Sequence, residues 1–518
     1  MKKYIIYLLA ALIPYAVSAQ GVNITGTVVD EADQPLPGAS VVIEGTGNGT
    51  VTDVDGKFAI EAGKGSVLVF DFMGYTSQKV TVGDRREINV KLLPSSEMMD
   101  ELVVVGYGVQ KKVNVTGSVA TVKYDEMAVS RPATNSEGLL KGASAGLYVY
   151  QNSGKPGGEG IDIKIRGIGT LNSSNPLVIV DGFESSMNNV DPVDIASVSV
   201  LKDAASCAIY GNRGANGVVL ITTRSAGKDK FTIEYNGMVA IQEPSNYVPL
   251  ITNYADYMQV VNESAENIDA PQPFSQTMID LWREKELDPY GIAESGYPNY
   301  VAYPNTDWMK AMYRTNIYQK HSIMASGSGK RTKYTISLAY MDNPGIVDYT
   351  GMKRFSMRAN VSSQVTDFLE IGARIFGYRT EREVCDFDSS QQYMARAVPG
   401  IYPYYDGKYG WMENAEQNSM SRNNLYFLNR ANGHDGSFYA NATAFLNVSL
   451  PLGIRWSTNF NYIYSNTYGY FVRGKGNAWS FSKGEIAYRY DNLSNFSRKD
   501  TYDESNRWTV QTLSLIHI

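Results

Sequence analysis

The sequence FYANATAFLNVSL, from Phe438 to Leu450, alternates two kinds of side chain over its whole length. Every second residue from Phe438 to Leu450 is apolar, and Asn441 and Thr443 are among the residues between them. Successive side chains of a β-strand point to opposite faces, so this pattern predicts a strand with one apolar and one polar face. After a Pro-Leu-Gly break, IRWSTNFNYIYS (454–465) repeats the pattern.

Other runs after residue 230 have the same alternation, namely FTIEYNGMVAI (231–241), KYTISLAYM (333–341) and RFSMRANVS (354–362). These runs are longer than the five or six residues usual in a soluble strand, and aromatic residues lie near the ends of several apolar faces. About ten alternating residues with aromatic rims are typical of a strand tilted across an outer membrane. A soluble β-sandwich is the alternative, and it accounts poorly for strands of this length.

The connections between these runs differ in length. Turns near 326–330, 365–367 and 451–453 are short, whereas the connections at roughly 242–317 and 379–435 are long. Short turns on one side and long loops on the other are typical of bacterial outer-membrane barrels. The pattern predicts a mainly β chain, with the first part of an antiparallel transmembrane barrel over residues 228–518.

Composition supports the same fold class. The chain has 518 residues, which suggests two to four domains, and it contains 37 tyrosines and 47 glycines, as expected for β-barrels with aromatic belts. A formal net charge of −6 makes nucleic acid an unsuitable partner. Cys207 and Cys385 are the only cysteines and lie in different regions, so no disulfide framework is expected.

The first residues, MKKYIIYLLAALIPYAVSAQ, predict a signal peptide over residues 1–19. Lys2 and Lys3 form its charged start, an apolar segment covers 4–15, and small residues precede a cleavage site before Gln20. This apolar run is too short for a membrane anchor, and no later run reaches about 18 apolar residues.

Residues 20–95 contain short strands separated by turn residues, which predicts a small β-sandwich. GTVVDEADQPLPGASVVIEGTGNGTVTDVDGKF (26–58) resembles the carboxypeptidase-regulatory-like β-sandwich. Asp53–Gly56 reads as an Asp-Gly hairpin turn rather than a calcium loop, since the remaining ligands are missing.

Residues 110–227 read as a mixed α/β domain. GLLKGASAGLYV (138–149) predicts a short helix and a turn. Four segments predict strands, namely IDIKIRGIG (161–169), PLVIVDG (176–182), IASVSVLKD (195–203) and NGVVLITT (216–223).

DELVVVGYGVQKK (100–112) lies between these two domains, and the expected linker covers 96–109. An unpaired valine run invites aggregation, so its presence in a linker calls for a function. The outer membrane has no ion gradient and the periplasm has no ATP, so the energy for transport must come through a partner protein. An extended peptide can transmit a pulling force by joining the edge of that partner's sheet. The alternative is an ordinary strand of a neighbouring domain.

DELVVVGYGVQKKVNVTGSV (100–119) is similar to the TonB box and plug entry of the SusC/RagA family of TonB-dependent outer-membrane transporters. IRGIGTLNSSNPLVIVDG (165–182) and VSVLKDAASCAIYGNRGANGVVLITT (198–223) resemble the plug of that family. Two positions depart from the family pattern, Cys207 where alanine is usual and Leu102 in place of a common valine. The resemblance places the TonB box at Asp100, Glu101, Leu102, Val103, Val104, Val105, Gly106, Tyr107 and Gly108. It places the plug motifs at Arg166, Gly167, Asp181, Gly182, Lys202, Asp203, Tyr210, Gly211, Arg213 and Gly214.

The resemblance implies a plug inside a barrel of about 22 strands in the outer membrane, in contact with its lipid. TonB, with ExbB and ExbD, would pull on the box and shift the plug, and a SusD-like surface lipoprotein would act as a lid. The substrates implied are oligosaccharides, with peptides for some members. Arg166 and Arg213 are expected either to pair with carboxylates on the lumen wall or to stabilise a glycine-rich turn.

About ten strands after residue 230 cannot close a barrel of about 22, because an open edge would leave backbone groups unpaired in lipid. We therefore expect the chain to be an N-terminal fragment of a longer product. The final LSLIHI (513–518) also resembles a translated sequencing adapter.

No pattern for an enzyme, a cofactor or a metal site is found. The three histidines, His321, His434 and His517, lack metal-ligand spacing, with His321 expected at the start of a strand and His434 in a loop. KPGGEG (155–160) lacks the lysine and hydroxyl of a phosphate loop, and no nucleophile elbow is present.

The loop GIYPYYDGKYGWMEN (400–414) places aromatic rings beside acids and amides, which suits a sugar-binding surface. Packing against the plug or the lid partner is the alternative. The other functions considered are peptide import, a passive pore or adhesin, and a siderophore or cobalamin receptor. The candidate substrate contacts are Tyr402, Tyr404, Tyr405, Tyr409 and Trp411.

Overall fold

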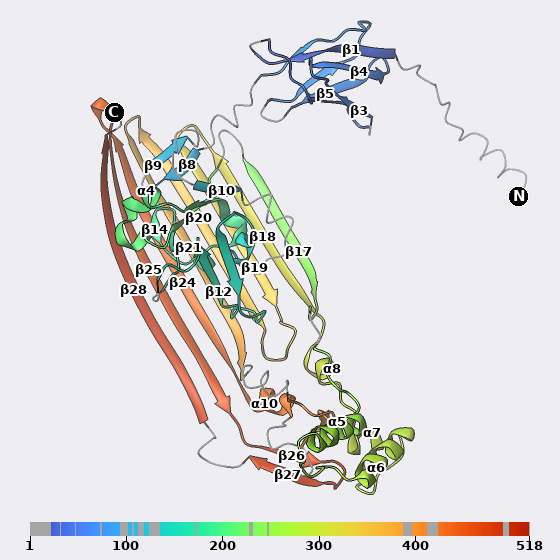
Figure 1. Cartoon of the computed structure of the whole chain (residues 1–518). Helices are drawn as coiled ribbons and strands as arrows, with labels where there is room; N and C mark the ends of the chain where they lie inside the picture. The colour runs from blue at the N-terminus through green and yellow to red at the C-terminus, as the bar shows by residue number, and fades with distance from the viewer. Residues whose placement is uncertain are drawn as a thin grey trace, which may run out of the picture. The chain divides into compact units, whose positions relative to one another are not determined.

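The structure is a computed structural model of the whole chain (Figure 1). It divides into two compact units, 1–118 and 119–518. The expected signal peptide lies outside the described residues. The structure describes residues 22–31, 33–46, 48–72, 75–93, 102–105, 108–111, 119–123, 135–170, 173–226, 231–245, 248–386, 396–411, 423–490 and 497–516.

The first unit contains a sandwich of two sheets. One has the order β4-β1-β7, with bounds Lys57–Ala62, Val22–Val29 and Val90–Lys91. The other has the order β3-β2-β5-β6, with bounds Gly49–Val51, Ser40–Ile43, Val67–Asp71 and Gln78–Thr81. Alternate residues of each strand point inward, and Val28, Val41, Leu68 and Phe70 are fully buried in the core.

The Asp53–Gly56 segment forms a turn, as predicted, with Gly56 at φ +73° and its N–H donating to the Asp53 carbonyl. The prediction of a hairpin is wrong, however. The turn joins β3 to β4, and these strands belong to different sheets, because β4 pairs with β1.

The valine run also pairs in the first unit. β8 (Leu102–Val105) and β9 (Gly108–Lys111) form an antiparallel pair in which Val104 lies opposite Val109. Among the described residues this pair belongs to no larger sheet. Asp100, Glu101, Gly106 and Tyr107 lie outside the described residues.

The plug domain has the predicted mixed α/β structure. β13 and β16 are parallel, and Val198, Val200 and Val219 are fully buried in its core. The sheet order is β10-β15-β16-β13-β14, with bounds Val119–Lys123, Ile195–Leu201, Val218–Thr223, Leu177–Val180 and Phe183–Glu184. Beside it lie the hairpin β11-β12 (Leu147–Gln151, Ile161–Ile165) and the helices η2 (Gly138–Leu140), η3 (Met187–Asn189), η4 (Pro192–Asp194), α4 (Ala204–Cys207) and η5 (Ala208–Gly214).

The predicted transmembrane strands form one antiparallel eight-stranded sheet in simple up-and-down order (Figure 1). The outward side chains of Phe438 and Phe460 are exposed, whereas the inward Asn461 is buried. The strands are β17 (Thr232–Gln242), β18 (Asn316–Ser328), β19 (Thr332–Asn343), β20 (Met352–Thr366), β21 (Leu369–Cys385), β24 (Ala431–Ser449), β25 (Ile454–Arg473) and β28 (Ser497–Ile516).

These strands are longer than predicted and contain up to 20 residues. At about 3.3 Å per residue they are longer than the apolar band of about 25 Å that the prediction assumed, so the apolar alternation covers only part of each strand. β21 therefore continues to Cys385 and β24 begins at Ala431, where the sequence predicted a loop. The placement of His434 in a loop is wrong for the same reason, since it lies in β24.

The predicted asymmetry of the connections is confirmed. Short turns join β18 to β19, β20 to β21 and β24 to β25, whereas helices and a small sheet gather at the opposite end of the strands (Figure 1). The helices are α5 (Tyr254–Glu266), α6 (Gln276–Leu287), α7 (Asn299–Ala302), α8 (Trp308–Met312) and α10 (Asn424–Arg430). The small sheet is β22-β23-β26-β27, with bounds Tyr404–Tyr405, Lys408–Gly410, Gly476–Ser480 and Glu485–Tyr490. None of the helices in the described ranges has the length and apolar character that a membrane span requires.

Candidate functional site: the contact between the plug and the sheet

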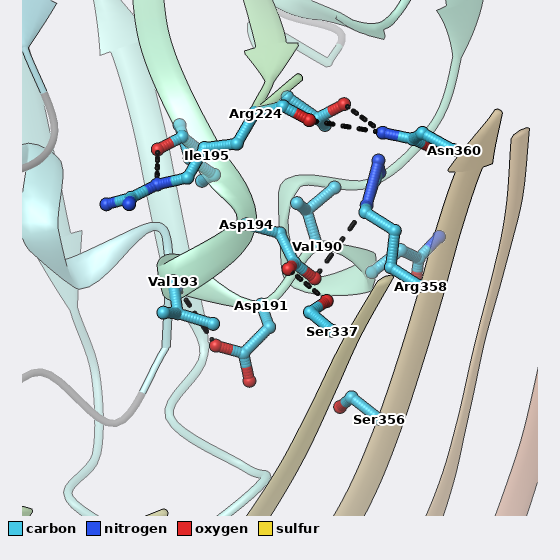
Figure 2. Close-up of polar contacts among 12 residues, drawn as sticks. Val190, Asp191, Val193, Asp194, Ile195, Arg224, Ser337, Ser356, Arg358 and Asn360 are labelled. Carbon is cyan, nitrogen blue, oxygen red and sulfur yellow. Dashed lines mark hydrogen bonds and ion pairs between the residues drawn. The ribbon is translucent and has the colours of Figure 1, made fainter. Parts of the chain in front are cut away.

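The inner face of β20 carries the polar half of the run RFSMRANVS. Arg358 and Asn360 reach toward the plug, while the outward Phe355 and Met357 are exposed (Figure 2). The amide of Asn360 donates to the Arg224 carbonyl at 3.2 Å. The strand thus exposes apolar side chains on one face and presents cations and amides to the plug on the other.

Asp191 provides the first charged contact. It precedes η4, and its carboxylate accepts a hydrogen bond from the Val193 N–H at 3.1 Å. Lys320 of β18 lies 2.8 Å from the same carboxylate, and both side chains are almost fully buried. Since a buried charge without a partner is costly, this pair fixes η4 against β18.

Asp194 provides the second contact, at the other end of η4. Arg358 Nε lies 3.7 Å from its carboxylate, and each of these two side chains is only 4% exposed. The Ser337 hydroxyl of β19 donates to the other carboxylate oxygen (Figure 2). Asp194 thereby connects the plug to two neighbouring strands.

The pKa values of the two aspartates are shifted in opposite directions. Burial raises the pKa of Asp194 to about 6, and the nearby charge of Asp191 adds to this, although Arg358 and Ser337 lower it. Burial would also raise the pKa of Asp191, but Lys320 and Arg354 outweigh it and lower that pKa below its ordinary value. Of these two neighbouring buried carboxylates, Asp191 therefore stays ionised and Asp194 protonates more easily.

Asp181 and Gly182 of the predicted plug motif form the turn after β13. Both have positive φ, +47° and +95°. The Asp181 carboxylate accepts from the N–H and the hydroxyl of Thr223, at 3.0 and 2.7 Å, which ties β13 to the end of β16. Arg358 lies 3.3 Å from the same carboxylate, so this motif also reaches the sheet.

Arg354 makes a third contact, with backbone rather than carboxylate oxygens. Its guanidinium donates to the carbonyls of Asn188 and Asn189, at 2.8 and 3.3 Å, and lies 4.2 Å from the centre of the Tyr378 ring. The Tyr378 hydroxyl donates to the Asn189 side chain at 3.1 Å. The segment 188–194 is therefore held by β18, β19, β20 and β21 together.

Pairing with a carboxylate on the wall is one of the two alternatives expected for Arg213, and the described residues show a different partner. Arg213 pairs with Glu184 of the plug itself at 2.6 Å. Arg166 is exposed and occupies the turn after β12 with φ +58°, followed by Gly167 at φ +94°. At the buried contact the signs are the reverse of the prediction, because the plug supplies the acids and the sheet supplies the cations.

The remaining motif residues build the plug from within. Lys202 donates to the Ser144 hydroxyl and the Ala145 carbonyl, both at 2.6 Å. Asp203 caps α4 by accepting from the Ser206 N–H at 2.8 Å.

The other motif residues, Tyr210, Gly211 and Gly214, lie in η5. A Cβ on Gly214 would approach the Cys207 carbonyl to 2.9 Å, so the chain needs glycine there. Cys207 is buried as a free thiol.

A polar cavity of about 330 Å³ opens where the plug meets the sheet, near the end of β21 and the start of β24. Glu159 and Asn188 line it from the plug, and Arg382 and Asp435 line it from β21 and β24. Arg382 binds Asp435 in a bidentate pair, at 2.9 and 2.6 Å, and donates to the Gly157 carbonyl at 2.6 Å. The cavity can offer both donors and acceptors to a polar ligand.

The tyrosine-rich loop lies far along the strands, within the external connections. Tyr402 packs edge-to-face on Tyr300, and Tyr404 is 50% exposed beside Tyr409. Trp411 is only 6% exposed and stacks on Tyr488 at 4.3 Å, so its ring is occupied by packing between loops. Tyr405 likewise packs against Tyr297, Tyr300 and Phe481.

No sequence motif marks Asp191, Asp194, Lys320, Arg354 or Arg358 as site residues. The available signal was the polar half of each alternating strand, together with the two acids of the segment DPVD (191–194). Within the described part of the chain, no three His, Cys, Asp or Glu side chains are arranged to hold a metal ion.

Comparison with known proteins supports both N-terminal domains. Residues 24–104 match the CarboxypepD_reg-like domain, and residues 111–218 match the TonB-dependent Receptor Plug Domain. The chain is 30% identical to TonB-dependent receptor P3 of Formosa agariphila, over 99% of this chain and 49% of that protein. It is 35% identical to TonB-dependent receptor SusC of Bacteroides thetaiotaomicron, over 66% of this chain and 32% of that protein.

Among solved structures, the RagAB peptide importer in its "open-open" state aligns with a TM-score of 0.58 and 27% identity, over 72% of this chain and 43% of the other. The chain thus spans about half the length, or less, of the proteins it matches. The chain belongs to the SusC/RagA family of TonB-dependent receptors, because its two matched domains, its sheet with a docked plug and these relatives all agree.

Proposed function

We propose that the protein takes part in TonB-driven import of nutrient oligosaccharides across the bacterial outer membrane. The observation that carries this proposal is the buried contact of Asp191 and Asp194 with Lys320 and Arg358. A plug fixed on the inner face of a membrane-spanning sheet blocks free passage. Work must then be done on the plug before a substrate passes, which is the step that a periplasmic pull supplies.

The valine run is the proposed point of attachment. β8 and β9 form an isolated two-stranded pair among the described residues, and such a pair is marginally stable in water. β8 can therefore exchange its pairing for an edge strand of TonB, which ExbB and ExbD energise. The box assigned to residues 100–108 would act as the tether.

The proposed setting is the outer membrane, with a SusD-like surface lipoprotein as the lid on the side of the long connections. The partner follows from the likeness to SusC and to the RagAB assembly. An enzymatic role has no support from the site, which offers charge pairing and hydrogen bonding to backbone.

Oligosaccharides are the proposed substrate class. The polar cavity lined by Glu159, Arg382 and Asp435 suits hydroxyl groups, and the external loops add tyrosine rings. Peptide import is the second candidate, since the RagAB structures of similar fold are described as a peptide importer. A passive pore or adhesin would use the same sheet without the box.

The experiment is a deletion of Asp100–Tyr107 in the protein's own gene, followed by growth on polysaccharides or on peptides as the sole carbon source. Loss of growth on a polysaccharide supports driven oligosaccharide import. Loss on peptides alone supports the second candidate. Growth of the deletion strain at the parental rate on every substrate that requires the gene contradicts driven import. A glycoside hydrolase or a peptidase encoded beside the gene would independently favour one substrate.

A further inference from the structure

A second pocket, of about 580 Å³, lies among the external connections. One wall comes from the segment that contains α6, α7 and α8, and the other comes from the tyrosine-rich loop and α10. The aromatic residues Tyr300, Tyr303, Tyr402 and Tyr404 line it. A pocket of this size is typical of sites for small ligands.

The two walls are held together beneath the pocket. The Thr306 hydroxyl donates to the Ile401 carbonyl at 2.8 Å, and the Trp308 indole N–H donates to the Val398 carbonyl at 2.8 Å. All four residues are buried. Tyr300 and Tyr402 lie edge-to-face with ring centres 5.8 Å apart, which joins the walls a third time. The pocket is therefore preformed rather than assembled by its ligand.

Polar groups on the rim are oriented by their neighbours. The Asn305 side-chain oxygen accepts from the Tyr254 N–H at 2.8 Å, which turns its amide nitrogen away from that bond. Within the described chain this nitrogen donates to no other group. The Glu286 carboxylate is held by the Asn253 amide, at 3.0 and 3.1 Å. One wall thus offers a donor and an acceptor to a ligand, beside aromatic faces.

We propose that this pocket binds one or two rings of a neutral oligosaccharide, as a subsite that precedes the lumen; the inference rests on the function proposed above. A pyranose ring has an apolar C–H face, which suits a tyrosine ring, and hydroxyl groups at its edge, which suit Asn305 and Glu286. The side chain of a peptide would need mainly aliphatic walls. The described lining has four uncharged aliphatic residues, Pro289, Ala311, Pro403 and Leu425, which lie among four tyrosines and several polar groups.

Tyr404 is the residue to change, because its ring lines the pocket yet is half exposed, and among the described residues it contacts one other ring, that of Tyr409. The probes are maltohexaose, cellohexaose, xylohexaose, mannohexaose and tetraalanine. Binding to the purified protein, expressed from its whole gene, is measured by isothermal titration calorimetry. We expect one of the saccharides to bind and Tyr404→Ala to weaken that binding about tenfold.

Two variants separate a binding role from a structural one. Tyr404→Phe keeps the ring and should restore binding. Ile268→Ala removes a 75% exposed apolar side chain of the same connections, outside the lining, and should leave binding unchanged. Binding of none of the four saccharides, equal losses in Tyr404→Ala and Ile268→Ala, or Tyr404-dependent binding of tetraalanine alone would each overturn the proposal.

The same variants distinguish this inference from the proposed function. Import that depends on the box but not on Tyr404, with unchanged calorimetry, would remove the subsite and leave driven import in place. If saccharide binding depends on Tyr404 but uptake by cells does not depend on the box, the subsite is supported and driven import is contradicted.

Discussion

The guanidinium of Arg358 lies 3.7 Å from the carboxylate of Asp194, between a plug helix and a strand of the membrane sheet. The same arginine lies 3.3 Å from Asp181, in the turn of the VDG motif. One cation of β20 therefore neutralises two carboxylates that belong to separate plug elements. This relationship makes Arg358 the centre of the contact that resists movement of the plug.

Replacement of Arg358 by methionine should loosen the plug. The change leaves the buried Asp194 and the partly buried Asp181 without their cation, and the loss of one partner from a buried pair costs about 3 to 5 kcal/mol. Cys207 is buried in the plug and can report on this, in a Cys385→Ser background so that it is the only cysteine among residues 1–518. We expect the urea concentration that exposes Cys207 to a thiol reagent to fall markedly.

The matched control is Arg379→Met. Arg379 pairs with Glu381 at 2.8 Å on β21, and both side chains are well exposed, so the pair should contribute little. Equal shifts in the two variants would show that the buried contact has no special role.

The plug contact should weaken as the pH rises. Burial raises the pKa of Asp194 to about 6, above its ordinary value of 3.8, so the folded state binds this proton more tightly than the unfolded state. The stabilisation of the folded state by this proton is complete below the ordinary pKa of 3.8 and is lost as the pH rises through about 6. The groups that face it are Arg358, Ser337, Lys320 and Asp191, and the lowered pKa of Asp191 acts oppositely only in more acidic solution.

The measurement is the urea midpoint of Cys207 exposure from about pH 4 to about pH 7, with labelling pulses at one fixed pH. The midpoint should decrease over this range in the parent chain. Asp194→Asn removes the titrating group and should flatten the profile. A parent midpoint that rises with pH would contradict the assignment.

The alternation of apolar and polar residues predicted the sheet well, because a sheet with one apolar and one polar face requires a period of two. Phe438 and Phe460 point outward as expected, and the short turn at 451–453 lies where the sequence placed it. The prediction failed where the outer face of a strand is no longer apolar. Residues 431–437 lie in β24, but their polar sequence resembles a loop.

The plug motifs were also readable from sequence, but their partners were not. Asp181 and Asp203 have local roles, in a turn and a helix cap, that a short motif can specify. The ion pairs of Asp194 with Arg358 and of Asp191 with Lys320 join residues more than 100 positions apart. Only the packing of the plug on the sheet brings these residues together, so one sequence cannot reveal them.

Gly410→Ala should disturb the external pocket. A Cβ at this position would lie 2.1 Å from the Tyr402 carbonyl oxygen, and a backbone atom cannot move aside as a flexible side chain can. We expect faster proteolysis of the tyrosine-rich loop on intact cells and weaker saccharide binding. Gly474→Ala, whose new atom would meet the Arg430 carbonyl only at 3.7 Å, is the matched control. Equal proteolysis in both variants would contradict this account of the loop.

The central claim, that a pull on the valine run opens the plug, is tested most directly by measuring substrate uptake in cells that carry Val103→Pro and Val104→Pro together. Proline has no amide hydrogen, so the two changes remove donors from both edges of β8 while the length of the linker stays the same. Val103→Thr with Val104→Thr keeps the donors and a strand-forming residue type. The account predicts that the proline variant, present at the normal level in the membrane, loses uptake, whereas the threonine variant retains it. Uptake at the parental rate by the proline variant would contradict the account.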